Sequence, residues 1–584
     1  MAFEHHEVRD AVLAATSAAR TREVHAALAA AVEARASERG SLAAPERRLL
    51  VRHALRGHDG TRAAPHLVAA LGALLASGRP AEVVELATAG LGVAGAVRAG
   101  DASAVLVLRG RSRFHTDDVA GGIADFDEAA CRAREAGDDS GARECALLAL
   151  QGRAMQGRVA ESCAAAGRLL EECVAAGDAP AADQARLTLA ITLMRLARPE
   201  DALPHLRHCA ESASRRGPSA ESAEARLHLA QAIGETGHPV ESLDELAVAL
   251  AFLRTAGAPV TLVWTLGGRA AALTMLGRRS EAVEAVDEAA RLARSVGDGA
   301  MEGASRAFQA ELLRCLGRPG EAAALHERVR QLAARGFAPG NECQLVRWHA
   351  HLLLGDGRTA EALAEFERCR DLAIRGERVA MRLFASIAIA GIHARWRDER
   401  CVRAALDDAQ SVAVETRSPR LLAFAAEASG AWGGTNCGPD PSALRTCLAL
   451  LADLDLPEFH ASVALRCARF DAVEHRLDDA VRHALAARRE LAGCEAPNLH
   501  LTCDALLAAL GASDPAPVSA RLATEWDTYE LFTRVEAAGL LGQAALFGRA
   551  RADTDFAAGH APPEHVGALR ASLERDLAGL KADR

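Results

Sequence analysis

Hydrophobic and small residues recur along most of this chain at spacings of three, four and seven, the pattern of helices with one buried face. Each such helix runs to a short turn, and a second helix follows directly. The turns come every 40 residues, at Gly157, Ala197, Gly237, Gly277, Gly317 and Gly357. The pattern therefore predicts a tandem array of helix pairs, one for every 40 residues.

The array extends in both directions from this central part. One step back places a turn at Asp117, and one and two steps forward place turns at Arg397 and Cys437. Further units near Gly78 and His475 fit with slips of one or two residues. The chain is therefore expected to hold about ten to eleven units.

Four positions of the unit keep the same character along the array. Mostly small residues stand seven positions before the turn, as at Ala270, and five positions after it, as at Ala282. Larger residues such as Leu206 and Phe366 recur nine positions after the turn, and the position twelve after it is also apolar. Small residues let two antiparallel helices approach closely, and the larger ones fill the space to the next pair. A loop containing glycine is expected to end each second helix.

The order of small residue, glycine turn, small residue and alanine resembles the tetratricopeptide repeat (TPR). The 40-residue period exceeds the usual repeat of about 34 residues, and it is similar to the long-helix repeats of the sensor regions of bacterial signalling ATPases. The resemblance covers roughly residues 65–510. It implies an all-α, right-handed α-solenoid of antiparallel helix pairs, whose first helices line a concave groove.

The N-terminal segment resembles the stretch that follows the ATPase module in signal-transduction ATPases of the maltose-regulator type and in large bacterial kinases fused to them. The matching residues are Phe3, His5, Val8, Arg9, Asp10, Val12, Arg22, His25, Leu28, Glu33, Arg52, His53 and Ala54. In that family the ATPase lies upstream of this stretch. The resemblance therefore implies either the tail of a longer signalling protein or a stand-alone derivative that lacks the ATPase.

These observations divide the chain into three expected parts. Residues 1–64 form an N-terminal helical segment, 65–512 the TPR-like solenoid, and 513–584 a C-terminal helical cap that shields the last apolar face. Pro515–Pro517 is expected to mark the break before the cap. A last helix is expected to start at Pro562, because proline suits the first turn of a helix.

Composition excludes whole classes of chemistry. Lysine and arginine together number 68, but the sole lysine is Lys581. A phosphate-binding P-loop and a protein kinase each need a lysine at a defined place in the fold, so neither is expected here. The usual nucleophile-elbow and zinc-protease motifs are also missing. We therefore expect no catalytic residues, and any ATPase or kinase activity would belong to another segment or protein.

Net charge and cysteine spacing limit the kinds of partner and ligand to be expected. The net charge is −10, with both signs interspersed and no basic stripe, so a nucleic-acid partner is not expected. No stretch has the pattern of a signal peptide or a membrane span, so a cytoplasmic protein without a membrane partner is expected. The 14 cysteines occur singly, without a Cys-x-x-Cys pair. No metal site and no cofactor are therefore expected.

Two other groups of polar residues have simple structural explanations. His205 and His208 share a helix face with Cys209, which falls in a buried column, and no further metal ligand is evident. A glutamate follows many turns, as at Glu161 and Glu281. There it is near the start of a helix, where the helix dipole favours a negative charge.

The candidate binding surface is the face of each first helix that points into the groove. Its columns lie 13, 6 and 2 positions before the turn, and their residues vary along the array, unlike those of the packing columns. Trp264 and Phe384 are its large aromatic residues, which are suitable binding anchors. The candidate groove residues are Glu224, Gln231, Glu235, Trp264, Met275, Glu311, Arg314, Gln344, Arg347, His351, Phe384 and Arg395.

The sequence therefore favours a non-catalytic scaffold or effector-sensing region of a bacterial signalling protein. A protein or peptide segment, or a small effector, would bind in the groove, and binding would be relayed to an ATPase or kinase module. Alternatives are a stand-alone adaptor that bridges two partners and a small-molecule-binding regulatory domain. An enzyme that uses scattered acidic residues is a further alternative.

Overall fold

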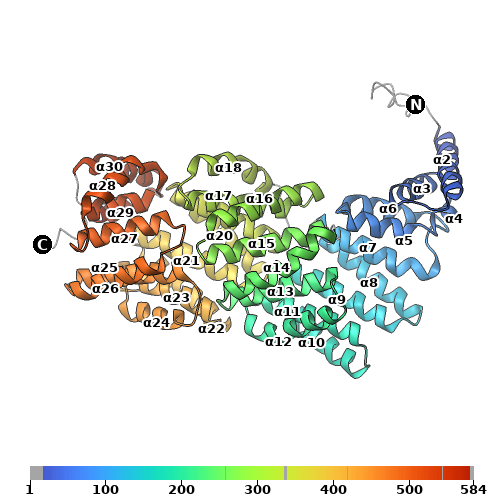
Figure 1. Ribbon diagram of the computed structural model, residues 1–584, viewed down its shortest axis with the longest axis horizontal. Helices are drawn as coiled ribbons and strands as arrows, with labels where there is room; N and C mark the ends of the chain where they lie inside the picture. Colours follow the sequence, from blue (N-terminus) through green and yellow to red (C-terminus); the bar gives the residue numbers. More distant parts are fainter. Residues whose placement is uncertain are drawn as a thin grey trace.

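The structure, a computed structural model, describes residues 17–116, 118–256, 258–334, 339–416, 418–529, 531–541 and 544–578. All regular elements in these ranges are helices, which follow one another along the long axis from α2 and α3 at one end to the α27–α30 region at the other (Figure 1). The predicted all-α solenoid of helix pairs is confirmed. The N-terminal match from Phe3 to Val12 lies outside the described residues.

Helix pairs make up most of the molecule. They are α5 (Leu67–Ala76) and α6 (Pro80–Gly92), α7 (Ala102–His115) and α8 (Val119–Glu135), α9 (Asp139–Met155) and α10 (Val159–Ala175), α11 (Ala179–Arg195) and α12 (Pro199–Arg215), α13 (Ala220–Glu235) and α14 (Pro239–Ala256), α15 (Pro259–Met275) and α16 (Arg279–Val296), α17 (Gly299–Cys315) and α18 (Pro319–Ala333), α19 (Pro339–Gly355) and α20 (Thr359–Arg375), α21 (Val379–Arg395) and α22 (Glu399–Thr416), α23 (Pro419–Trp432) and α24 (Pro441–Leu451), and α25 (Pro457–Val473) and α26 (Leu477–Glu490).

The remaining helices lie at the two ends. At the N-terminal end are α2 (Ala18–Arg39), α3 (Ala44–Arg56) and the short α4 (Gly60–Ala63). At the C-terminal end are α27 (Pro497–Ala509), α28 (Pro515–Thr524), α29 (Leu531–Leu541), α30 (Ala544–Gly559) and α31 (Val566–Ala578). No helix among the described residues is long and apolar enough to cross a membrane.

The packing columns predicted from the sequence are buried. The alanines seven positions before the turn, from Ala190 through Ala390, are fully buried, as are Leu206 and Phe366 on the second helices. Clusters of buried apolar side chains therefore recur between successive helix pairs along the array, as a solenoid requires.

The second helix of several pairs begins without a cap of its own. Arg158 and Arg278 occupy the N-cap positions of α10 and α16, and neither side chain caps the helix. Such a helix start leaves backbone N–H groups without partners inside the helix. These groups are partly satisfied by residues that lie far along the chain.

Acceptors for these N–H groups come from the next turn of the superhelix. Glu377, 217 residues away, accepts a hydrogen bond from the backbone N–H of Ala160 at 2.7 Å. Glu495 accepts from Ser280 N–H at 2.5 Å, and the carbonyl oxygen of His560 accepts from Ala360 N–H at 3.1 Å. Successive turns of the superhelix are therefore in direct contact, and the helix starts of one turn are completed by the next.

Further contacts join successive superhelical turns. The N–H of Asp455 donates to the carbonyl oxygen of Gly237 at 2.9 Å, and that of Glu495 donates to Gly277 at 2.8 Å. Arg279 forms a largely buried ion pair with Glu458. One superhelical turn thus takes about 218 residues, between five and six 40-residue units.

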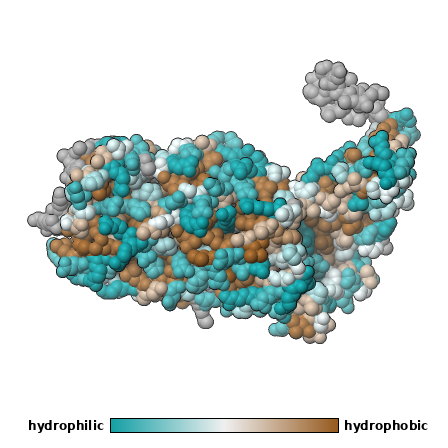
Figure 2. Space-filling model, viewed as in Figure 1, coloured by the Kyte–Doolittle hydropathy of each residue, from teal (hydrophilic) through white to brown (hydrophobic). Residues whose placement is uncertain are grey.

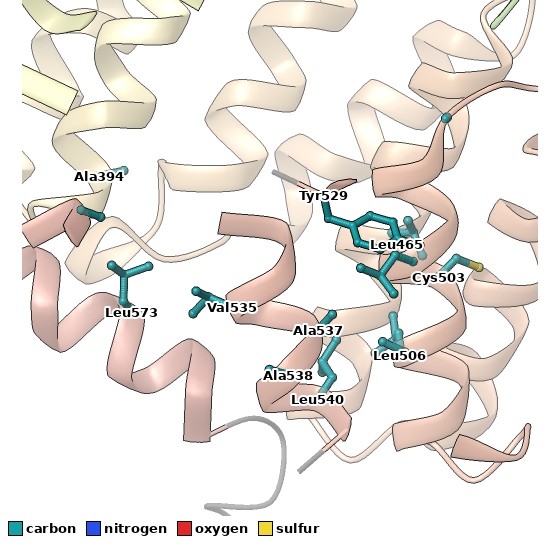
Figure 3. Close-up of a cluster of buried hydrophobic side chains, with 14 of the residues drawn as sticks. Ala394, Leu465, Cys503, Leu506, Tyr529, Val535, Ala537, Ala538, Leu540 and Leu573 are labelled. Atoms are coloured by element: carbon teal, nitrogen blue, oxygen red, sulfur yellow. The ribbon is translucent and has the colours of Figure 1, made fainter. Parts of the chain in front are cut away.

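The C-terminal helices share a core with the repeats. Leu465 of α25, Leu506 of α27 and Val535 of α29 belong to one buried cluster that extends from Ala350 to Leu573 (Figure 3). Apolar contacts therefore cross the expected boundary at residue 512 without interruption, and the division into three parts stays a prediction.

Two details of the expected cap are wrong. Pro515 is the first residue of α28, so the break falls just before the prolines. The last helix begins at Val566, because Pro562 opens a turn closed by a 2.8 Å hydrogen bond from His565 N–H to its carbonyl oxygen. The His565 ring stacks on Trp396 with centroids 4.6 Å apart, which fixes this turn against α21 and α22.

A pair of glycine substitutions tests the contact between superhelical turns. Gly157 and Gly217 both have positive φ, 93° and 99°. A Cβ atom on Gly157 would lie 1.8 Å from the carbonyl oxygen of Arg375, whereas one on Gly217 would meet nothing within 4 Å. We expect Gly217→Ala to cost about 1 kcal/mol through backbone strain alone. Gly157→Ala should cost roughly 1–3 kcal/mol more through overpacking.

Thermal and urea unfolding of the two variants measure this difference. Equal losses of stability would mean that the superhelical turns do not touch at Gly157.

Candidate binding channel

A channel of about 1580 Å³ runs inside the superhelix. The first helices of the pairs, from α7 to α23, form most of its wall. The outer surface of the molecule has hydrophobic and hydrophilic residues interspersed over the face shown in Figure 2. The channel is therefore a large concave surface on which a ligand could bind.

The predicted groove columns lie largely along this channel. In the column 13 positions before the turn, the predicted residues line it, and Phe424 one unit further along does too: Glu144, Gln184, Glu224, Trp264, Ala304, Gln344, Phe384 and Phe424. The column follows the inner face of each first helix, because equivalent residues of successive units point the same way. The 40-residue repeat is thus sufficient to find this part of the wall.

Ten of the twelve candidate groove residues line the channel. Arg314 instead lines a separate cavity of about 220 Å³, which His351 and Arg395 also border. Glu311 lines neither cavity. It is buried and accepts hydrogen bonds from the Arg314 guanidinium at 2.6 and 3.0 Å. A ligand-binding role for the twelve residues stays a prediction.

An aromatic belt, of which the sequence analysis identified only Phe384, lies on the channel wall. Phe308 and Trp348 stack with ring centroids 4.5 Å apart, and Phe384 meets Phe424 edge to face at 5.4 Å. Phe308 and Trp348 stand nine positions before their turns, which is outside the three columns assigned to the groove from the sequence. Phe424 continues the Phe384 column by one unit, so a longer alignment of the repeat would have found it.

Charged side chains divide the channel into regions. Near the N-terminal end, Arg111 faces Glu144 at 3.5 Å. Further along, Arg420 of α23 forms an ion pair with Glu235 of α13, 185 residues away. This ion pair lies on the channel wall and joins two superhelical turns.

His351 is a buried titratable group at the junction of the two cavities. Burial lowers its pKa to about 4, and the neighbouring cations Arg347 and Arg314 act in the same direction, against the carboxylate of Glu311. Its ring packs edge to face on Phe366 at 5.0 Å. His351 is therefore a neutral part of the wall at neutral pH.

The smaller cavity lies between the repeats and the C-terminal helices. Arg314 and Arg395 come from the repeats, whereas Glu536 comes from α29 and Asp576 from α31. Burial raises the pKa of Asp576, and the nearby Glu536 carboxylate adds to this effect. The C-terminal helices thus meet the repeats through charged as well as apolar side chains.

One group of side chains among the described residues has the spacing of possible metal ligands. The ligand atoms of His393, Asp398 and Cys401 lie within 4.8 Å of one another. Asp398 accepts a hydrogen bond from the Cys401 backbone N–H at 3.1 Å, the geometry of a helix cap at the start of α22. The cap accounts for the position of the carboxylate, and the expectation that no metal is bound stays a prediction.

No protein-family model matches the chain, and no curated protein matches it significantly. Solved helical-repeat structures are similar to it. A Rap protein complexed with competence and sporulation factor is 12% identical over 69% of this chain and 98% of its own, with a TM-score of 0.35. Human IFIT1, a dimer with PPP-AAAA, is 14% identical over 73% and 90%, with a TM-score of 0.37. The pentatricopeptide repeat protein PPR10 from maize is 15% identical over 96% and 95%, with a TM-score of 0.21. The fold itself is a TPR-like α-solenoid.

The buried histidine gives a pH prediction. The pKa of His351 is lower in the folded state than in the unfolded chain, so between pH 6.5 and about 4 the unfolded chain binds more protons. Stability should therefore fall as the pH is lowered through this window, by at most about 3 kcal/mol from this one group. His351→Gln should weaken the pH dependence of the melting temperature between pH 7 and 4.5.

The exposed His475, which forms no ion pair among the described residues, serves as the control. His475→Gln should leave the pH dependence of the melting temperature as in the wild-type chain. Parallel curves for all three proteins would show that His351 does not titrate as a buried group.

Proposed function

We propose that this chain is a non-catalytic scaffold that binds an extended peptide segment of a partner protein in its channel. The observation that carries the proposal is the channel itself, with a volume of about 1580 Å³. Pockets for small ligands usually have volumes of roughly 300–1000 Å³. A channel of this size suits a peptide of several residues better than one small molecule.

The chemistry of the wall supports a peptide. Gln151, Gln231 and Gln344 offer amide donors and acceptors for a peptide backbone. Trp264, which is 39% exposed, and the aromatic belt of Phe308, Trp348, Phe384 and Phe424 offer apolar anchors. Polar groups between aromatic anchors are what a binding site for an extended segment requires.

The superhelix offers a way to transmit binding. The channel is lined by two successive superhelical turns, and Glu235–Arg420 and Ala160–Glu377 are contacts between them. A ligand that touches both turns would favour one spacing between them and so change the positions of the ends. The resemblance of the N-terminal segment supports an ATPase or kinase module as the recipient of this signal in a bacterial, cytoplasmic protein.

Two alternatives differ from this proposal, one in the ligand that occupies the channel and the other in the effect of binding. In a small-molecule regulatory domain, an effector would occupy only one region of the wall. In a stand-alone adaptor, partners would bind without any change in the superhelix. The net charge of −10 argues against a nucleic-acid partner in each case.

A peptide selection tests the proposal. The full chain is used to select binders from a random library of ten-residue peptides, and the selected peptides are titrated against variants. Trp264→Ala should weaken binding at least tenfold, because buried tryptophan anchors commonly contribute about 2 kcal/mol or more. Helicity and melting temperature should stay nearly unchanged, because the side chain is substantially exposed.

Val248→Ala is the matched control, because Val248 of α14 is 53% exposed and outside the channel lining. This variant should bind the selected peptides like the wild-type chain. Failure of the library to yield any binder, or equal weakening by both variants, would contradict peptide binding in the channel.

A further inference from the structure

Four arginines gather on one region of the channel wall. They are Arg195 at the end of α11, Arg347 in α19, Arg378 directly before α21, and Arg420 in α23. One carboxylate, Glu235 at the end of α13, stands among them and is paired with Arg420.

The cluster is assembled from two superhelical turns. Arg195 and Glu235 belong to the earlier turn, and Arg378 and Arg420 to the later one. The earlier turn packs directly on the later one beside the cluster, because Ala197 shares a buried apolar cluster with Leu383. Arg347, from the intervening part of the chain, completes the group from α19.

In the part of the chain that the structure describes, only Arg420 of these four arginines forms an ion pair with a carboxylate. Among the described residues, no carboxylate lies within ion-pair distance of Arg195, Arg347 or Arg378. Arg195 makes one long hydrogen bond of 3.4 Å to the carbonyl oxygen of Ala154. The guanidinium of Arg347 lies over the Trp348 ring at 4.0 Å, and its Nε is buried without a hydrogen-bond partner.

Arg420 is also incompletely satisfied. It is only 9% exposed, and its Nε is buried without a partner although the guanidinium is paired with Glu235. Such a buried N–H group can donate to an acceptor on a ligand that enters the channel.

Burial and mutual repulsion raise the free energy of these charged arginines. Burial lowers the pKa of Arg195 to about 9, with the positive charge of Arg378 adding to the effect. Burial also lowers the pKa of Arg347 and of Arg378, and the charge of Arg420 lowers that of Arg347 further. Partly buried cations that repel one another are stabilised by an anion placed between them.

We propose that Arg195, Arg347, Arg378 and Arg420 form a subsite for an oxyanion, a carboxylate or phosphate group, which binds between two superhelical turns. Guanidinium groups suit this role because their parallel N–H groups match the geometry of carboxylate and phosphate oxygens. The aromatic rings of Trp348, Phe384 and Phe424 beside the cluster would hold the apolar part of the ligand. The inference rests on the proposed function and adds that the bound segment is acidic at this point.

Glu235 should have the opposite effect to the arginines on the affinity for an anion. Its carboxylate already occupies one face of Arg420 and lowers the net positive charge of the subsite. Removing its charge should therefore tighten the binding of an anion, whereas removing an arginine charge should weaken it.

The experiment compares two fluorescein-labelled ten-residue peptides that differ only in four central residues, glutamate in one and glutamine in the other. Isothermal titration calorimetry and fluorescence anisotropy with the full chain measure both affinities. The acidic peptide should bind at least tenfold more tightly. Arg378→Gln and Arg195→Gln should each reduce this preference about tenfold, and Glu235→Gln should increase it.

Arg132→Gln is the matched control, because Arg132 of α8 is outside the channel lining and forms an ion pair with Glu128 at 3.2 Å. It should leave the preference for the acidic peptide unchanged. Melting temperatures without peptide check folding, and Arg378→Gln should melt at or above the wild-type temperature because it removes charge repulsion. A loss of melting temperature in Arg378→Gln would mean that this cation already has a stabilising partner and would overturn the proposal.

Inorganic phosphate distinguishes the source of the anion. It should raise the melting temperature of the wild-type chain, compared with chloride at equal ionic strength, but not that of Arg378→Gln. If phosphate acts in this way and neither peptide binds, the subsite stands as a site for a small anion and peptide binding fails. If the two peptides bind equally in every variant and phosphate has no effect, the oxyanion subsite is overturned while the proposed function stands.

Discussion

Contact between successive superhelical turns is the constraint on which the rest of this structure depends. At Gly157 the carbonyl oxygen of Arg375 comes so close that no side chain fits, and Glu377 from the same loop completes the start of α10. A repeat protein whose units touch only their neighbours could open or close like a spring. Here the uncapped helix starts and the turn glycines contact loops that lie about 218 residues further along the chain. These contacts hold successive turns of the superhelix together.

This constraint also determines what the inside of the molecule can do. It brings Arg420 against Glu235 and places Arg378 close enough to Arg195 to lower its pKa. The chemistry of the channel therefore depends on two turns at once, not on any single repeat. A ligand held by both turns would stabilise the same spacing that the backbone contacts already favour.

The sequence predicts the features that are local to one unit. The 40-residue period, the buried column of Ala190 to Ala390 and the channel column of Glu144 to Phe384 all follow from helical geometry within a unit. The channel positions of Arg378 and Arg420 do not, because they depend on the pitch of the superhelix. That pitch is set by contacts such as Ser280 with Glu495, which no repeat alignment reveals. The burial of the Glu311–Arg314 pair within α17 was also missed, since a helix column gives a direction but not how deeply other elements cover it.

The 218-residue period bears on how such a protein can evolve. Solenoids commonly change length by duplicating or losing whole units, and in an open array an added unit disturbs only its two neighbours. In this chain, an extra unit between Ser280 and Glu377 would shift the loops that follow it by one place relative to the earlier superhelical turn. Glu495 would no longer face Ser280, and the arginines that now share a site would separate. Units can therefore be gained or lost freely only near the ends, and the middle of the array is expected to keep its length.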